Sequence, residues 1–381
     1  MSAGTALLGS ATGVSAVIGG AQLAGTGVIV NYPSADARHL PDVKASAWVI
    51  ADAGTGQVLA AKDPHGEFRP ASTLKVLTAD ALIPDLNPSA TLVASKLAAS
   101  QTPNDIGLLA GHSYTVSSLF TALLTISAND AAVALTQGAG DGSLAQGMTL
   151  INAEAHHLQA DDTVAVTPNG LDAPGQHTSA YDLALIGRQA LKLPAFLQYD
   201  EVEGGLFKLS AHKSVGLWNQ NGLLTQYPGA IGGKIGWTSA AGATYVGMAR
   251  RNGVTLIVTL LHCPALTEVA FAEKLLNWGF AEDGRIKPAG TLVAPLSPVT
   301  AKPAPAVSPP SDAHVAAARH ASLSSPSALA AIGFSVVAVL AAAASIIYSR
   351  RQRPDSQRPL AGAGTARGLV TITGTGHHSP F

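Results

Sequence analysis

Short apolar runs and helical patterns divide residues 41–285 into strands at the two ends and helices between them. Residues 45–52 and 57–62 are apolar runs separated by a glycine-containing turn at residues 53–56, which predicts a pair of strands. Apolar residues at helical spacing predict helices farther along the chain. The predicted helices cover residues 72–82, 116–126, 131–137, 152–158, 180–191 and 265–280.

Two more β-rich segments, residues 243–250 and 254–262, precede the last predicted helix. They are joined by Asn252-Gly253, the strongest short sequence signal for a two-residue hairpin turn. Strands at both ends of a domain, with helices between them, favour an antiparallel sheet that the two ends build together. We therefore predict an α+β domain over residues 41–285, in which a helical insert separates the two halves of the sheet.

An apolar segment rich in glycine, serine and threonine precedes this domain at residues 1–40, and its first arginine is Arg38. A secretory signal peptide normally starts with a basic region, which this segment lacks. We interpret it as a signal-like segment or a weak membrane anchor. A flexible N-terminal tail is the alternative.

A second apolar segment lies near the other end of the chain, where Ala328–Tyr348 contains 21 residues without a charge. As a helix it would measure about 32 Å, which matches the hydrocarbon core of a bilayer. Arg350, Arg351 and Arg353 follow at once. Arginines on one flank favour a transmembrane helix, predicted at residues 327–348, over a buried alanine-rich helix.

This anchor sets the rest of the predicted organisation. Residues 286–326 are rich in proline, alanine and serine, a composition typical of an extended linker. The short tail, residues 349–381, carries the arginines that the positive-inside rule places in the cytoplasm. We therefore expect a single-pass protein of the bacterial cell membrane, with residues 40–326 outside the cytoplasm.

Composition and charge narrow the classes of partner. Hydrophobic residues make up 47% of the 381 residues, enough for a large core. The formal net charge of −1 argues against a nucleic-acid-binding surface. Cys263 is the only cysteine, which excludes an internal disulfide framework and a cysteine-based zinc site.

The first candidate chemistry is the segment Ser72-Thr73-Leu74-Lys75. Residues three apart share one face of a helix, so the Lys75 amine can reach the Ser72 hydroxyl. A serine at a helix start can act as a nucleophile if a neutral lysine accepts its proton. Taken alone, Ser72 is more simply a helix N-cap, and Ser210-Ala211-His212-Lys213 has the same spacing.

Two further segments carry polar groups suited to the same site. Ser127-Ala128-Asn129 lies between two predicted helices, where Ser127 can relay a proton and Asn129 can hold an amide; a helix cap is the alternative. Lys234, followed by Gly236, can bind a carboxylate and lower the pKa of Lys75. Its alternative is an exposed lysine on an edge strand.

Taken in order, the three segments resemble the SxxK, SxN and KTG motifs of penicillin-recognising serine enzymes. Residues 69–78, 167–184, 229–242 and 275–280 resemble segments of low-molecular-mass D-alanyl-D-alanine carboxypeptidases, the S11-like peptidases. The resemblance covers about residues 41–285. The Glu-x-x-Leu-Asn loop of class A β-lactamases is missing, which favours the carboxypeptidases.

The resemblance implies a serine β-lactamase/transpeptidase-like fold and a D,D-carboxypeptidase that needs no metal or other cofactor. Ser72 would attack the bond between two terminal D-alanines of a peptidoglycan stem peptide, Lys75 would take its proton, and Ser127 would protonate the leaving group. β-Lactams would acylate the same serine. The substrate-binding residues implied are Asn129, Lys234, Gly236, Trp237 and Thr238, with the N–H groups of Ser72 and Trp237 as oxyanion donors.

One residue departs from the family pattern, because Ile235 stands where these enzymes have a threonine. A lost hydrogen bond to a charged group is worth about 1.5–3 kcal/mol, so weaker carboxylate or β-lactam binding follows. Ile235 is also the one feature that favours a non-hydrolytic cell-wall-binding homologue. A D,D-endopeptidase or transpeptidase, which shares the acyl-enzyme but uses another acceptor, is a further alternative.

Overall fold

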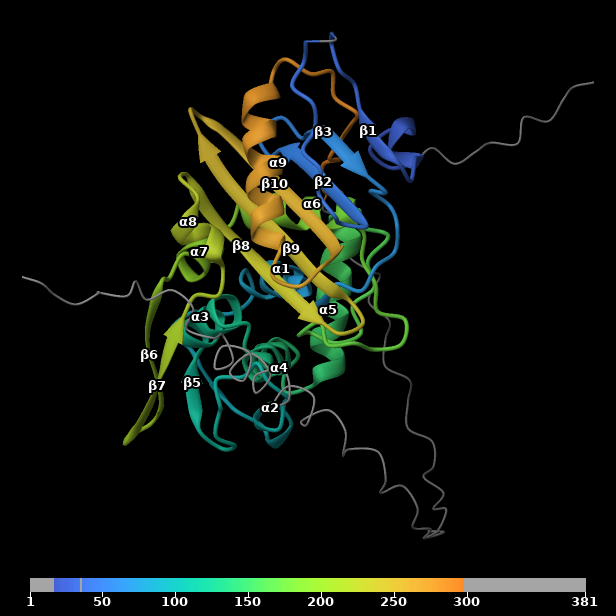
Figure 1. Ribbon diagram of the computed structural model, residues 1–381. Coiled ribbons are helices and arrows are strands. Elements are labelled where there is room, and N and C mark those ends of the chain that lie inside the picture. Colours follow the sequence, from blue (N-terminus) through green and yellow to red (C-terminus); the bar gives the residue numbers. More distant parts are fainter. Residues whose placement is uncertain (1–16, 35, 298–381) are drawn as a thin grey trace, which may run out of the picture. The chain divides into compact units, whose positions relative to one another are not determined.

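The computed structural model describes residues 17–34 and 36–297 (Figure 1). The strands are β1 (Val28–Val30), β2 (Ala47–Asp52), β3 (Gln57–Lys62), β4 (Thr91–Val93), β5 (Ser113–Thr115), β6 (Gly204–Ser210), β7 (Lys213–Trp218), β8 (Ala230–Thr238), β9 (Gly242–Arg251), β10 (Val254–Cys263) and β11 (Gly290–Thr291). The helices are η1 (Ala21–Ala24), η2 (Ala71–Thr73), α1 (Leu74–Leu82), α2 (Lys96–Ala99), α3 (Val116–Thr125), α4 (Asn129–Ala139), α5 (Leu144–His157), α6 (Ala180–Ala190), α7 (Pro194–Asp200), α8 (Gly222–Gln226) and α9 (Glu268–Glu282).

Strands from both ends of this part of the chain form one antiparallel sheet. Its order is β1-β3-β2-β10-β9-β8, and β11 also pairs with β3. Helices η2 to α8 and two two-stranded sheets, β4–β5 and β6–β7, lie between β3 and β8 in the sequence. The predicted α+β arrangement, with a helical insert dividing the sheet, is confirmed. Within the described residues, β8 is the strand at the far edge from β1.

The folded unit extends beyond residues 41–285 at both ends. β1 lies before that range and β11 after it, yet both hydrogen-bond to β3. Leu23, in η1, is buried in the core. Residues 17–30 of the predicted N-terminal segment therefore form part of the domain, because their apolar side chains and backbone groups find partners on β3 and its neighbours.

The β9–β10 hairpin follows the sequence prediction closely. Arg251 pairs with Val254, which leaves Asn252 and Gly253 as the two loop residues. Their φ angles of 50° and 82° are both positive, as the favoured two-residue hairpin turn requires. Asparagine and glycine tolerate this conformation better than other residues do.

Helix α9 covers one face of the sheet, lying across β10, β9 and β2 (Figure 1). Leu275, Leu276 and Trp278 of α9 are buried against this face, together with Leu256, Val258 and Leu260 of β10. The Trp278 indole N–H donates to the Arg38 carbonyl at 2.8 Å, so the helix also holds the segment before β2.

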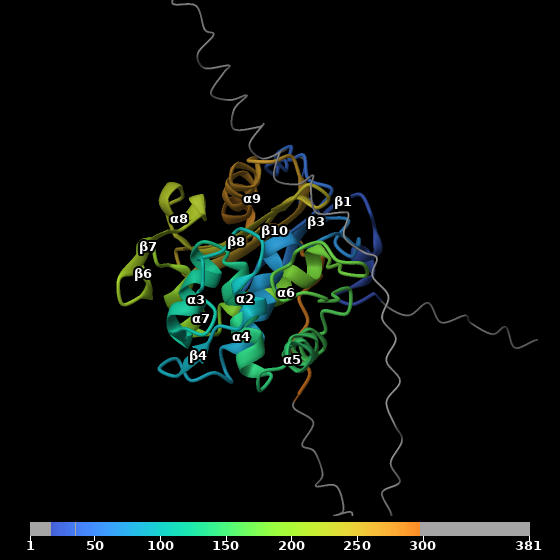
Figure 2. The ribbon, with the colours of Figure 1, turned by 90° about the horizontal axis from the view of Figure 1, so that it is seen from below.

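The opposite face carries α6 and α1 and the rest of the helical insert (Figure 2). Ile257 and Leu261 of β10 point into this larger core, while Val258 and Leu260 point to α9. Because β10 is buried on both faces, it is apolar almost throughout rather than alternating. α1 is buried along its whole length and carries the first candidate motif.

Helix α5 begins at Leu144, eight residues earlier than predicted. Ser143 caps it by accepting a hydrogen bond from the Gln146 N–H. Gly147 weakens the helical pattern in the sequence. In the structure, however, a Cβ at Gly147 would stand 2.0 Å from the Thr136 carbonyl oxygen, so the glycine allows α5 to approach α4 closely. Tertiary packing thus explains a residue that local propensity disfavours.

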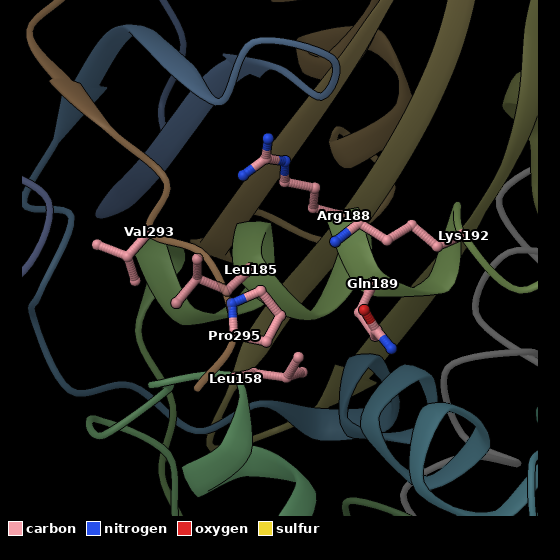
Figure 3. Close-up of a pocket in the computed structure, with 7 residues that line it drawn as sticks. All are labelled: Leu158, Leu185, Arg188, Gln189, Lys192, Val293 and Pro295. Carbon is pink, nitrogen blue, oxygen red and sulfur yellow. The ribbon is translucent and has the colours of Figure 1, made fainter. Parts of the chain in front are cut away.

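After β11 the chain crosses α6 and reaches the end of α5. Figure 3 shows Val293 and Pro295 of this segment beside Leu158 and Leu185, with Arg188 reaching up from α6. The Arg188 guanidinium donates to the Leu292 carbonyl at 3.1 Å. The segment is therefore fixed to the helical face of the domain.

No helix in residues 17–34 or 36–297 is both long and apolar enough to cross a membrane. The predicted transmembrane helix at residues 327–348, the tail at 349–381 and most of the linker at 286–326 lie outside the described residues.

The packing of α9 gives a stability prediction. Leu275→Ala should lower the free energy of unfolding by about 2–5 kcal/mol, because a fully buried leucine leaves a cavity when it is truncated. Lys274→Ala, at an exposed neighbouring position, is the control and should change it by less than about 0.5 kcal/mol. Urea denaturation measures both, and equal effects would show that α9 does not pack as described.

Candidate active site

Ser72 lies in η2, directly before α1, and is half-buried. Its hydroxyl is 2.9 Å from the Lys75 amine. The predicted capping alternative is wrong, because Thr73 is the N-cap of α1 and no side chain makes a cap hydrogen bond there. The Ser72 hydroxyl is therefore committed to Lys75 rather than to the helix backbone.

Lys75 is fully buried, and its amine has three partners. Besides Ser72, the amine donates to the Asn129 Oδ1 and to the Asn169 backbone carbonyl, each at 2.7 Å. Burial lowers the pKa of Lys75 well below its usual value, and the nearby Lys234 charge lowers it further, while Asp130 opposes both effects. The predicted influence of Lys234 on this pKa is confirmed.

These contacts define the state in which Lys75 can act as a base. Carbonyl oxygens accept hydrogen bonds and cannot donate them. When the Lys75 amine is neutral, its two N–H groups can go to Asn129 and Asn169, which leaves its lone pair for the Ser72 hydroxyl at 2.9 Å. The Ser72 O–H then donates to that lone pair. This geometry suits removal of the serine proton during nucleophilic attack.

Ser127 precedes α4 in a left-handed conformation, with φ of 63°. Its side chain is 4% exposed, and its hydroxyl oxygen has no hydrogen-bond partner within the described residues. Asp130, three residues later, holds the neighbouring loop, because its carboxylate accepts hydrogen bonds from the N–H groups of Ile106, Gly107 and Leu108. A buried hydroxyl without a partner is uncommon, and at this position it is free to take part in proton transfer.

Asn129 is held on both sides of its amide by the protein. Oδ1 accepts from Lys75, and Nδ2 donates to the Thr102 carbonyl at 2.8 Å. These partners make Asn129 a positioning residue for Lys75. Its predicted contact with a substrate amide remains a prediction.

Lys234 extends from β8 into the core and is 1% exposed, which excludes the alternative of a solvated edge-strand lysine. Its amine donates to the Ile235 carbonyl at 2.9 Å. Burial lowers the pKa of Lys234 to about 8, and the charge of Asp200 opposes that shift. A pKa of about 8 leaves Lys234 mostly cationic at neutral pH, and Lys234 loses this charge as the pH rises above that value.

Asp200, at the end of α7, is a member of the site that sequence reasoning missed. It is fully buried, and one carboxylate oxygen accepts the Gly233 N–H at 2.6 Å. Burial raises the pKa of Asp200 to about 7, against the influence of Gly233 and Lys234. No local pattern marks an aspartate at a helix end as the partner of a strand 33 residues away.

Gly236 brings β8 against the start of α1. A Cβ at this position would lie 2.7 Å from the Ser72 nitrogen and 2.9 Å from the Thr73 nitrogen, so only glycine allows this approach. Trp237, the next residue, is 57% exposed. The roles of the Trp237 and Ser72 N–H groups as oxyanion donors stay predictions.

The remaining motif residues border this site or lie apart from it. Thr238 donates to Asp172 at 3.1 Å, and Asp172 lies 3.7 Å from the Arg69 guanidinium. Ile235 pairs with Tyr245 and packs into the core beneath α9, on the sheet face opposite Lys234. The second match to the first motif forms the tip of the β6–β7 hairpin, where Lys213 is exposed, and does not reach the site.

The fold and the Ser72–Lys75–Ser127–Lys234 arrangement define a serine enzyme of the penicillin-recognising class. Residues 34–264 match the peptidase S11 family, described as D-alanyl-D-alanine carboxypeptidase. The chain belongs to this family of serine peptidases, which confirms the resemblance noted in its sequence.

Similar proteins and solved structures support the same family assignment. The chain is 38% identical to the D-alanyl-D-alanine carboxypeptidase DacB2 of Mycobacterium tuberculosis over 250 residues, which is 64% of this chain and 84% of that one. A crystal structure of a penicillin-binding protein homologue from the same organism has a TM-score of 0.64 and 36% identity, covering 68% of this chain and 98% of the other. The Streptomyces K15 DD-transpeptidase has a TM-score of 0.61 and 27% identity, covering 64% and 100%.

The buried charges predict a pH dependence for acylation of Ser72. The kcat/KM for acylation should fall on the acidic side as Lys75 becomes protonated, and on the alkaline side above about 8 as Lys234 loses its charge. Because the Asp200 charge raises the pKa of Lys234, Asp200→Asn should move the alkaline limb to lower pH.

Glu201→Gln is the matched control, since Glu201 is an exposed carboxylate beside Asp200. Rates of acylation by a chromogenic β-lactam, measured between pH 5 and 10, test the prediction. An alkaline limb that stays in place in Asp200→Asn would rule out Lys234 as its origin.

Proposed function

We propose that this protein is a serine D-Ala-D-Ala carboxypeptidase that removes the terminal D-alanine from peptidoglycan stem peptides. The observation that carries the proposal is the buried Lys75 amine, which lies 2.9 Å from the Ser72 hydroxyl and is held by one side-chain and one backbone carbonyl oxygen. Membership of the S11 family supports the same substrate.

The reaction follows from the positions of these groups. The Ser72 oxygen attacks the carbonyl carbon of the bond between the two D-alanines, and Lys75 takes the serine proton. The resulting oxyanion faces the Ser72 N–H, where positive backbone dipoles stabilise it. Ser127 passes a proton to the departing amine, the carbon–nitrogen bond breaks, and an ester on Ser72 remains. Water then attacks the ester and releases the shortened peptide.

Lys234 supplies the charge for the carboxylate at the end of the substrate. A buried cation beside the nucleophile favours an anionic substrate end, and the same contact suits the carboxylate of a β-lactam. We therefore expect β-lactams to acylate Ser72 as substrate mimics.

The alternatives differ in what attacks the ester. Similarity to a DD-transpeptidase keeps an amine acceptor open, because both reactions share the acyl-enzyme. A non-hydrolytic binding homologue has less support, since the buried Lys75 amine contacts Ser72 and lies near the charge of Lys234, an arrangement that suits a nucleophile and its base. Ile235 remains the feature that favours weaker activity.

For localisation we propose a bacterial cell-membrane protein with its catalytic domain outside the cytoplasm and residues 327–348 as the anchor. The arginines after that segment and the cell-wall substrate support this orientation.

The full chain and its Ser72→Ala variant test the activity. Incubation with penicillin should give a covalent adduct on Ser72, visible by intact mass, and a peptide ending in D-Ala-D-Ala should release free D-alanine. Ser72→Ala should lose both, because no other described group replaces the nucleophile. An adduct without D-alanine release would favour an amine acceptor, and a folded chain with neither would favour the binding homologue.

Ile235→Thr tests the departure from the family pattern. Because Ile235 packs beneath α9 on the sheet face opposite Lys234, the added hydroxyl should not reach the carboxylate, and the rate of acylation by β-lactams should match that of Ile235→Val. Ile235→Val is the matched control, because valine has the shape of threonine without its hydroxyl. Both variants lose a methylene from the core beneath α9, so a faster rate in Ile235→Thr would show that the hydroxyl does reach the carboxylate.

A further inference from the structure

The β6–β7 hairpin has one buried and one exposed face. Phe207, Leu209 and Leu217 are buried on the inner face, where the Phe207 ring lies 5.6 Å from that of Tyr114. On the outer face Leu206 is 81% exposed and Trp218 is 74% exposed. Two large apolar side chains on one solvent-facing surface are a feature of binding sites more than of inert surfaces.

Glycines form the floor beneath Trp218. In the hairpin register Gly204 lies opposite Trp218, and Gly216 is two residues before it on the same face. A Cβ at Gly204 would stand 2.7 Å from Cε3 of the six-membered ring, and one at Gly216 would stand 3.3 Å from Nε1 of the five-membered ring. The indole therefore lies flat across both strands and turns its other face to solvent.

The base of the hairpin lies near the segment that carries Ser127. Two residues after Trp218, the Gln220 N–H donates to the Thr125 carbonyl at 2.9 Å, and Thr125 is two residues before Ser127. The chain geometry limits the distance between the Cα atoms of Trp218 and Ser127 to about 20 Å. A ligand that extends from the active site by two or three sugar rings spans such a distance.

We propose that the outer face of this hairpin, formed by Gly204, Leu206, Lys208, Gly216 and Trp218, binds sugar rings of the peptidoglycan glycan strand. The inference rests on the proposed function, because the glycan carries the stem peptide covalently. A pyranose ring presents C–H groups that pack on an aromatic face, while its hydroxyls bond to nearby donors. The Trp218 indole N–H and the exposed Lys208 amine provide such donors.

The distribution of polarity on the hairpin favours a glycan over a lipid surface. Leu206 and Trp218 lie toward the base of the hairpin, whereas its tip contains the exposed His212 and Lys213. A hairpin that inserts into a bilayer places its apolar residues at the tip instead. Proximity to the segment that carries Ser127 likewise favours the polymer to which the substrate belongs.

The test compares two substrates of the full chain that end in the same pentapeptide, one free and one attached to its glycan chain. Trp218→Ala should lower kcat/KM for D-alanine release from the glycan-linked peptide about tenfold, which corresponds to a typical aromatic binding contact. It should leave kcat/KM for the free peptide within twofold. Unchanged acylation by penicillin shows that the variant is folded.

Gly204→Ala and Gly205→Ala form a matched pair. A methyl at position 204 would stand 2.7 Å from the Trp218 ring and 2.8 Å from the Leu217 carbonyl oxygen, so both the ring and the strand beneath it must shift, whereas one at position 205 meets nothing within 4 Å. Gly204→Ala should therefore reproduce the glycan-specific loss, and Gly205→Ala should not.

Five outcomes overturn the inference. Equal loss on both substrates, or loss on neither, shows that Trp218 does not bind glycan. Binding of phospholipid vesicles that depends on Trp218 assigns the face to a membrane, and a Trp218-dependent dimer assigns it to a second copy. If the unmodified chain releases no D-alanine even from the free peptide, the proposed function fails and this inference fails with it.

Discussion

The burial of one amine governs the rest of the site. Lys75 has no contact with solvent, so its charge is destabilised and its neutral form can remove a proton from Ser72. Burial alone would leave the amine free to turn. Asn129 and Asn169 prevent this, and each comes from a different segment of the helical insert. The helical insert therefore excludes water from the Lys75 amine, which the sheet alone would leave exposed.

The edge strand β8 joins the sheet to this amine. Gly236 lets the strand touch the start of α1, and Lys234 adds a second buried cation whose charge is balanced by Asp200. Two lysines in one dry region are unfavourable unless one of them is neutral or has a partner. Here burial lowers the pKa of both amines, and the Lys234 charge lowers that of Lys75 as well, so Lys75 loses its proton more readily than Lys234 does.

The sequence predicted the groups that react but not the groups that hold them. Ser72, Lys75, Ser127 and Lys234 were recognisable because they stand in short motifs, and the hairpin turn at Asn252-Gly253 followed from local backbone preference. Asp200 and the Asn169 carbonyl were not recognisable as members, since their roles depend on contacts 33 and 94 residues away in the chain. α5 was predicted too short for a related reason. Gly147 disfavours a helix locally, and only the close approach of α5 to α4 explains why a glycine stands there.

The two ends of the described chain meet on one side of the sheet. The Thr291 N–H donates to the Gly19 carbonyl at 2.8 Å, and β1 and β11 both pair with β3. Catalytic β8 lies at the other edge. A mechanical load applied through the chain beyond residue 297 would thus be borne first by the segment after β11, whose Leu296 N–H donates to the His157 carbonyl at 2.7 Å, and then by the two-residue β11 and by β3. Four strands separate that point of attachment from Lys234, counting β3, β2, β10 and β9. The fold therefore isolates its reactive groups from tension on the chain.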